Sequence, residues 1–189
     1  MRRLIYSMMV SLDGFVERSA GADRLDWVII DEELHSFAND QARAAGAFLY
    51  GRGMYENMAA FWPTADTAPG MPGYVVDFAR IWKPKPKIVF SRTLDRVQWN
   101  SRLVKENVAE EIFRLKSQPG GDLTVGGANF ASTVIELGLI DEYQLIVHPA
   151  VIGSGTPFFP PLRAIELRLL ETQTFGSGVV YLRYEPKGS

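Results

Sequence analysis

The sequence contains no cysteine, which excludes disulfide bonds, thiolate nucleophiles and sulfur ligands for metals. It has only two histidines, His35 and His148, and neither belongs to an H-E-x-x-H motif, so a zinc hydrolase is not expected. We therefore predict no metal site. A chain without cysteine also suits the reducing cytoplasm, which is the location that we expect.

Basic clusters and long apolar runs are missing as well. The formal net charge is −2 and no block of lysine and arginine occurs, so we expect no nucleic-acid partner. No apolar run approaches the roughly 18 residues of a membrane span, so we expect no membrane partner. The apolar run at 4–10 follows Arg2 and Arg3 but leads to Asp13 and Glu17 rather than to a cleavage site. This favours a buried strand over a signal peptide.

The common phosphate-binding and hydrolase motifs are also absent. Gly51 and Gly53 are followed by Glu56 where G-x-G-x-x-G needs a glycine, and no G-x-x-x-x-G-K-[ST] or G-x-S-x-G stretch occurs. A standard Rossmann dehydrogenase, a P-loop NTPase and an α/β-hydrolase are therefore disfavoured.

The composition that is present is typical of a packed globular protein. Hydrophobic residues make up 47% of the 189 residues and charged residues 22%, so we predict one domain, 1–189, around a buried core. Strands are predicted from β-forming apolar runs at 4–10, 47–50, 87–90, 97–99, 122–125, 143–148, 166–174 and 179–184. Helices are predicted from amphipathic patterns and caps at 31–45, 53–60, 74–82, 105–116 and 128–137. The intervening stretches 11–30, 61–73 and 149–161 are predicted as loops. This order indicates an α/β fold with a mostly parallel central sheet and a C-terminal antiparallel hairpin.

Three of the predicted strands end in residues that suit phosphate groups. Gly51-Arg52 follows the first of these strands, Ser91-Arg92-Thr93 the second and Gly126-Gly127 the third. In open α/β sheets ligands bind beyond the carboxyl ends of the strands, and the free N–H groups of a helix N-terminus favour anions. Each segment alone is consistent with an ordinary turn. Together they indicate a site for a ligand with several phosphates, onto which arginine forks.

The same segments resemble the dihydrofolate reductase superfamily. Gly51-Arg52-x-x-Tyr55-Glu56, Ser91-Arg92-Thr93 and the pair Gly126-Gly127 resemble that family's cofactor loops, in which the paired glycines are joined by a cis peptide. Ser11-Leu12-Asp13-Gly14, Leu139-Ile140-Asp141-Glu142 and the stretch from His148 to Gly155 are more similar to its riboflavin-biosynthesis reductase branch, here as a stand-alone member. The resemblance runs from about residue 3 to 184. It implies a three-layer dihydrofolate reductase-like fold.

The resemblance also implies NADPH as the cofactor. Arg52 and Arg92 would meet the 2′-phosphate and pyrophosphate, and the amides around 127–129 the pyrophosphate. The residues that it places beside the cofactor are Val10, Asp13, Gly14, Phe15, Gly51, Arg52, Ser91, Arg92, Thr93, Gly126, Gly127, Ala128, Asn129 and Phe130.

The proton donor that the resemblance implies is Glu33. Folate reductases carry an acid early in the first helix and a phenylalanine four residues later, and Glu33 and Phe37 match this spacing. The same glutamate is equally consistent with a first-turn acid that favours the helix dipole. Alternative acids nearby are Asp26, Asp31 and Glu32.

Four aromatic residues would line a slot for a flat heterocycle or would be ordinary core: Trp27, Phe37, Phe61 and Trp62. The expected activity is hydride transfer from NADPH to a small heterocyclic substrate such as a pterin, a folate or a ribosylamino-pyrimidine. Alternatives are a riboflavin-pathway reductase proper and a nucleotide-binding module without turnover. The resemblance also implies a homodimer.

Overall fold

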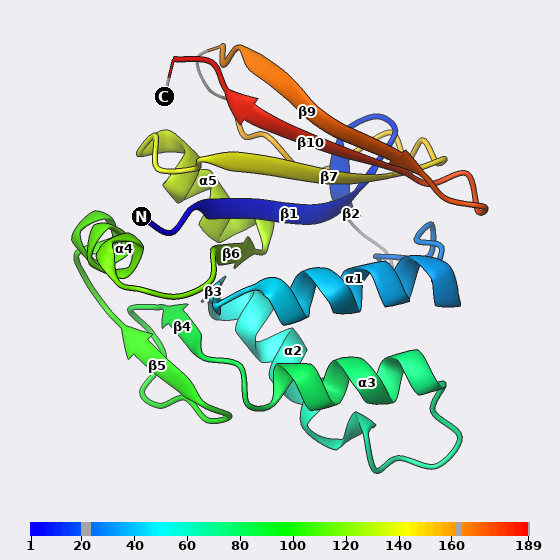
Figure 1. Ribbon diagram of the computed structural model, residues 1–189, viewed down its shortest axis with the longest axis horizontal. Coiled ribbons are helices and arrows are strands. Elements are labelled where there is room, and N and C mark those ends of the chain that lie inside the picture. The colour runs from blue at the N-terminus through cyan, green and yellow to red at the C-terminus, as the bar shows by residue number, and fades with distance from the viewer. Residues whose placement is uncertain (20–23, 162–163, 189) are drawn as a thin grey trace.

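The computed structural model describes residues 1–19, 24–161 and 164–188. Its centre is an eight-stranded sheet with the order β5-β4-β3-β6-β1-β7-β10-β9 (Figure 1). The strands are β1 (Leu4–Ser11), β2 (Phe15–Arg18), β3 (Ala47–Gly51), β4 (Lys87–Phe90), β5 (Ser101–Val104), β6 (Leu123–Gly126), β7 (Glu142–His148), β8 (Gly155–Pro157), β9 (Leu167–Thr174) and β10 (Val180–Pro186). Neighbours from β5 to β7 pair in parallel, whereas β10 is antiparallel to both β7 and β9.

Helices cover both faces of this sheet. They are α1 (Glu32–Ala44), α2 (Arg52–Ala65), α3 (Gly73–Trp82), α4 (Val108–Ser117) and α5 (Ala128–Glu136). The apolar sides of α4 and α5 form one core with β1, β6 and their neighbours, and α1, α2 and α3 form a second core over β3 and β4. This arrangement confirms the predicted three-layer α/β fold with a mostly parallel sheet and a C-terminal hairpin. No described helix is long and apolar enough to span a membrane.

The first helix begins where the sequence predicts. Asp31 has an extended backbone and its carboxylate accepts a hydrogen bond from the Leu34 N–H, which satisfies one of the free donors of the first turn. Glu32 and Glu33 then lie at the positive end of the helix dipole. The cap therefore fixes the start of α1 at Glu32.

Several predicted boundaries are wrong. The predicted strand at 97–99 does not form, because Trp99 and Asn100 have φ values of +60° and +54°, and the strand β5 begins only at Ser101. Helix α2 continues to Ala65 with Pro63 inside its last turn, so the loop predicted from 61 begins later. The loops predicted at 11–30 and 149–161 contain β2 and β8, which pair with each other as a small antiparallel sheet.

Candidate functional site

The three strand ends that the sequence singles out lie side by side. Strands β4, β3 and β6 are consecutive in the sheet and parallel, so their carboxyl ends share one edge. Arg52, after β3, donates from Nη1 to the Thr93 hydroxyl, after β4, over 3.1 Å. The structure therefore brings the predicted loops together into one surface.

The glycine pair lies at the start of α5. Gly127 has a φ of +91° and is the N-cap of this helix, without a side-chain cap, so the amide N–H groups of Ala128 and Asn129 remain free of a capping side chain. Gly51 likewise precedes α2 without a side-chain cap. Two helix N-termini thus direct their donors and dipoles to the same edge, which fits an anionic group such as a pyrophosphate.

The fold itself requires glycine at these positions. A Cβ on Gly127 would lie 2.8 Å from the Cβ of Met54, and one on Gly126 would lie 2.9 Å from the Tyr50 ring. A Cβ on Gly51 would lie 2.9 Å from the Cβ of Phe130. The described residues contain no cis peptide bond, so the cis linkage expected between the paired glycines from the resemblance is not found.

The two arginines differ in their surroundings. Arg52 is exposed and forms an ion pair with Glu56 over 2.8 Å, one turn along α2. Arg92 is exposed, and no carboxylate in the described part of the chain pairs with it. Between them, Ser91 accepts hydrogen bonds from the Thr93 and Leu94 N–H groups and holds the loop after β4 as a turn. Both guanidinium groups are exposed at this edge, and within the described residues only Arg52 of the two is engaged in an ion pair.

The turn after β1 is tied to the loop after β7. The Asp13 carboxylate accepts from Ser11 Oγ and from the N–H groups of Ile152 and Gly153, at 2.7–3.2 Å. The hydrogen bond from Ser11 is the main cause that lowers the pKa of Asp13. These contacts give Asp13 a structural partner, although the sequence placed it beside the cofactor.

The other residues predicted around that turn also serve the fold. The Val10 side chain is buried in the core on the α5 side, and the Phe130 ring stacks on Phe90 with centroids 4.5 Å apart. Gly14 has a φ of +91° and its carbonyl accepts from the Phe158 N–H. Phe15 donates its N–H to Ser11 Oγ. The side chains of Val10 and Phe130 are thus buried, whereas that of Phe15 is partly exposed.

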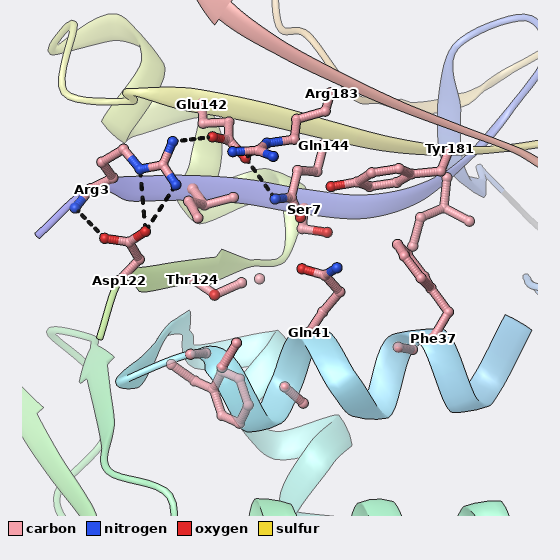
Figure 2. Close-up of a pocket in the computed structure, with 18 of the residues that line it drawn as sticks. Arg3, Ser7, Phe37, Gln41, Asp122, Thr124, Glu142, Gln144, Tyr181 and Arg183 are labelled. Atoms are coloured by element: carbon pink, nitrogen blue, oxygen red, sulfur yellow. Dashed lines mark hydrogen bonds and ion pairs between the residues drawn. The ribbon is translucent and has the colours of Figure 1, made fainter. Parts of the chain in front are cut away.

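A cavity of about 380 Å³ lies between α1 and the sheet (Figure 2). Its floor is formed by residues of β3, β6, β1, β7, β10 and β9, and its roof by the face of α1 that carries Phe37 and Gln41, with further residues of α2 and α3. Its lining includes Gly126 and Tyr50, which also border the strand edge described above. A ligand in the cavity would therefore abut a ligand at the edge.

One end of the cavity carries a network of charged groups around Glu142, which is fully buried. Its Oε2 accepts from Arg3 over 2.7 Å, and its Oε1 accepts from Arg183 and from the Gln144 amide over 2.7 Å each. The bond to Glu142 is also the main reason that the pKa of Arg183 is raised above its ordinary value. A buried carboxylate is tolerated only when its lone pairs are satisfied in this way.

The expected substrate residues do not all meet. Phe37 lines the cavity beside Tyr181, with ring centroids 4.9 Å apart. Phe61 and Trp62 lie on α2, where Trp62 packs on Phe78, so they do not form the predicted slot with Phe37. Trp27 is buried against His148 in an edge-to-face contact at 5.5 Å and also lies outside the cavity lining.

The predicted proton donor lies near the cavity rather than in it. Glu33 is exposed in the first turn of α1, and its Oε2 accepts from the Gly176 N–H of the β9–β10 turn over 2.9 Å. Of the alternative acids, Asp31 caps α1 and Asp26 pairs with Arg18 over 2.8 Å. The described residues contain no group of three side chains able to hold a metal ion.

His148 lies at the carboxyl end of β7 and is completely buried. Its Nδ1 accepts from the Ile29 N–H over 3.2 Å, while its Nε2 has no hydrogen-bond partner among the described residues. Burial lowers the pKa of His148, against a smaller opposing effect of Asp31. The histidine thus holds the segment before α1 against β7.

The polar residues of the cavity were not predicted from the sequence. Glu142 and Gln144 alternate with apolar residues on β7, a strand in the interior of the sheet. Polar side chains at alternate positions of an otherwise apolar central strand face a polar cavity or pair with each other, and this signal was present in the sequence.

Comparison with known proteins extends these observations. The family model described as the RibD C-terminal domain matches residues 2–181. The chain is 34% identical over 189 residues to the Bacillus subtilis (strain 168) protein YyaP, described as uncharacterized, covering 99% of this chain and 96% of that protein.

Solved structures with a similar fold are more distant in sequence. A dihydrofolate reductase from Enterococcus faecalis complexed with NADP(H) and RAB-propyl matches with a TM-score of 0.66 and 14% identity, over 98% of this chain and 96% of that one. RibD from Acinetobacter baumannii matches with a TM-score of 0.66 and 16% identity, over 99% of this chain and 58% of that one. These likenesses confirm the dihydrofolate reductase-like fold predicted from the motifs.

Proposed function

Because the chain belongs to the RibD C-terminal domain family, we propose that it is an NADPH-dependent reductase of a small heterocyclic substrate. The observation that carries this proposal is the shared edge of β4, β3 and β6, where two uncapped helix N-termini and two arginines surround one surface. The cavity under α1 reaches the same edge at Gly126. A nucleotide site and a substrate site therefore adjoin, as hydride transfer between two bound molecules requires.

The cofactor, when bound, supplies the hydride, and the protein supplies binding and orientation. Arg92 and Arg52 bind the phosphates, and the free amides at the start of α5 bind the pyrophosphate. The apolar part of the cavity, with Phe37, Tyr50 and Met54, excludes water from the reacting atoms. Glu33 is the proposed proton donor, and it would exchange its bond to Gly176 for one to the substrate or to a bridging water.

The test is an assay of NADPH oxidation with a panel of dihydropterins, dihydrofolate and a ribosylamino-pyrimidine, together with calorimetric titration of NADPH alone. We expect saturable NADPH binding and oxidation with at least one member of the panel. NADPH binding without oxidation by any member would contradict the proposal and would favour a nucleotide-binding module without turnover. An Arg92→Ala variant, assayed at limiting NADPH, is the control for specific cofactor use.

The riboflavin-pathway reductase proper is a second candidate, favoured by the family alone. It would need cations for a ribose phosphate, and the arginines of the cavity, Arg3 and Arg183, are already paired with carboxylates. The homodimer and the cytoplasmic location remain predictions. For the homodimer, the outermost strand β9 offers an open edge with Leu169 and Leu170 exposed.

A further inference from the structure

The polar end of the cavity contains several side chains without a hydrogen-bond partner. Gln41 points from α1 toward the sheet, and Ser7 on β1 and the hydroxyl of Tyr181 face the same space (Figure 2). No hydrogen bond within the described ranges uses the Gln41 amide or either of these hydroxyls. Gln41 is exposed and Ser7 is partly buried, whereas Tyr181 is only 2% exposed as a residue. Polar groups that converge in this way on a cavity are the usual feature of a binding site for a polar ligand.

The orientation of the Gln144 amide follows from its neighbours. Oε1 of Glu142, to which the amide is bonded, already accepts from Arg183. Carboxylate oxygens bonded to guanidinium groups act as acceptors, so Gln144 must present its NH₂ group to Glu142. Its carbonyl oxygen is then left as an acceptor for whatever fills the cavity, and Gln144 lines that cavity. A ligand therefore has to offer an N–H or O–H donor at this point.

The charge of the cavity limits the ligand further. Two arginines and three carboxylates line its polar end, namely Arg3, Arg183, Asp122, Glu142 and Glu171. Each of these arginines contacts two of the carboxylates, so no cation of this group is left unpaired and the net charge of the group is −1. A phosphate or carboxylate placed here would be repelled, and it would find no free guanidinium group among them.

From these contacts we infer that the cavity binds an uncharged heterocycle through a ring lactam, whose N–H donates to the Gln144 carbonyl oxygen, and that it discriminates against phosphorylated substrates. The inference rests on the proposed function, since it places the reducible ring in the cavity beside the nucleotide edge. Glu142 acts as a positioning residue, because it fixes the amide of Gln144. Gln41, Ser7 and Tyr181 complete the polar rim around the ring.

The first test is calorimetric titration, without NADPH, of hydroxymethyl-dihydropterin and of its N-methyl-lactam derivative, which lacks the donor. Gln144→Met preserves the side-chain length and removes the hydrogen-bond acceptor. It should therefore lower the affinity for the parent compound by about 10-fold and leave the affinity for the N-methyl derivative unchanged. Gln173→Met, on the exposed strand β9, is the matched control and should have no effect. Equal losses for both compounds, or no loss for either, would overturn the assignment of Gln144.

The second test uses the unmutated protein and does not depend on how any variant folds. The phosphate ester of hydroxymethyl-dihydropterin should bind at least about 10-fold more weakly than the alcohol. This difference in affinity should become smaller as the salt concentration rises. Equal or tighter binding of the ester would overturn the inferred discrimination. Because these titrations omit NADPH, lactam-specific binding in a protein that never oxidises NADPH would support this site and remove only the reductase proposal. If the protein oxidises NADPH but binds the pterin independently of Gln144, the reductase proposal would stand and the assignment of Gln144 would be overturned.

Discussion

Gly127 shows how one residue can meet a demand of the fold and of a ligand at once. Its φ is +91°, and a Cβ at this position would lie 2.8 Å from the Cβ of Met54, so any larger residue would be strained. A valine at this position would therefore clash within the protein itself, whether or not a cofactor binds. Exposed side chains at the same edge, such as Asn129 and Arg92, separate cofactor contact from folding more cleanly.

The buried His148 predicts a dependence of stability on pH. Since burial lowers its pKa from the ordinary value of 6.5, the unfolded chain takes up a proton below about pH 6.5 that the folded chain does not. The free energy of unfolding should therefore be highest above that pH and should fall with acidification, by up to about 1.4 kcal/mol per pH unit from this one group. Urea unfolding at several pH values between about 5 and 7 measures this dependence of the free energy of unfolding on pH.

The matched variant is His148→Asn, whose side-chain oxygen can still accept the Ile29 N–H. This variant should lose stability at neutral pH but should show a flatter acid limb than the parent protein. An unchanged slope would mean that His148 does not titrate differently in the two states.

Asp13 illustrates what a local motif cannot reveal. The Asp13-Gly14 pair correctly indicates a turn, and the resemblance placed it beside the cofactor. Its carboxylate accepts from the N–H groups of Ile152 and Gly153, which lie far along the chain, and its place beside the cofactor stays a prediction. Partners at such separation depend on the parallel pairing of β1 with β7, which no local pattern contains.

At the scale of elements, α1 is joined to the β9–β10 turn by the bond from Gly176 to Glu33. Glu33→Gln retains a side-chain oxygen for that bond but removes the ability to donate a proton as an acid. If Glu33 is the proton donor, the turnover number should fall by roughly 100-fold or more while NADPH affinity and the melting temperature stay nearly unchanged. Steady-state kinetics across a pH series, with titration of NADPH, measures this effect.

A purely structural Glu33 gives a different result. The variant would then retain the activity of the parent protein at every pH. Glu110→Gln, at an exposed position in the first turn of α4, is the control and should leave the turnover number unchanged in both cases.

Elements were predictable to the extent that their signals were local. The Asp31 cap, the buried runs of β1 and β4 and the glycine-marked ends of β3 and β6 all stand in the sequence. The strand predicted at 97–99 failed because Trp99 and Asn100 adopt left-handed conformations, which asparagine favours but tryptophan does not. The small β2–β8 sheet was missed because its strands are short and lie far apart in the sequence.

The cavity was less predictable than the cofactor edge. The edge follows from strand order and from residues directly after each strand, whereas the cavity depends on residues of six strands that the fold brings together. Phe37 was found from its helical spacing to Glu33, but Phe61 and Trp62 were grouped with it only by residue type. In the structure Trp62 packs on Phe78 of α3, and Phe61 is exposed on α2 beside Trp62.

For the molecule as a whole, two binding regions meet at Gly126. One is the polar, cation-bearing edge of β4, β3 and β6, and the other is the net-negative cavity under α1. On the proposed function, their opposite electrostatic character would direct a polyphosphate cofactor to the edge and an uncharged substrate to the cavity. On the same proposal, cofactor recognition would depend mainly on the two exposed arginines, Arg52 and Arg92.

The measurement that tests this claim most directly is titration of NADPH and NADH by quenching of tryptophan fluorescence. The two cofactors differ only in the 2′-phosphate, and a charged hydrogen bond contributes roughly 1.5–3 kcal/mol, or about 10- to 100-fold, less where the phosphate stays solvated. We predict that NADPH binds more tightly than NADH. Arg92→Ala and Arg52→Ala should each lower the affinity for NADPH far more than the affinity for NADH. Added salt should reduce the preference for NADPH. Arg168→Ala, on the remote strand β9, should change neither affinity. Equal affinity of the unmutated protein for the two cofactors would contradict this assignment of the arginines.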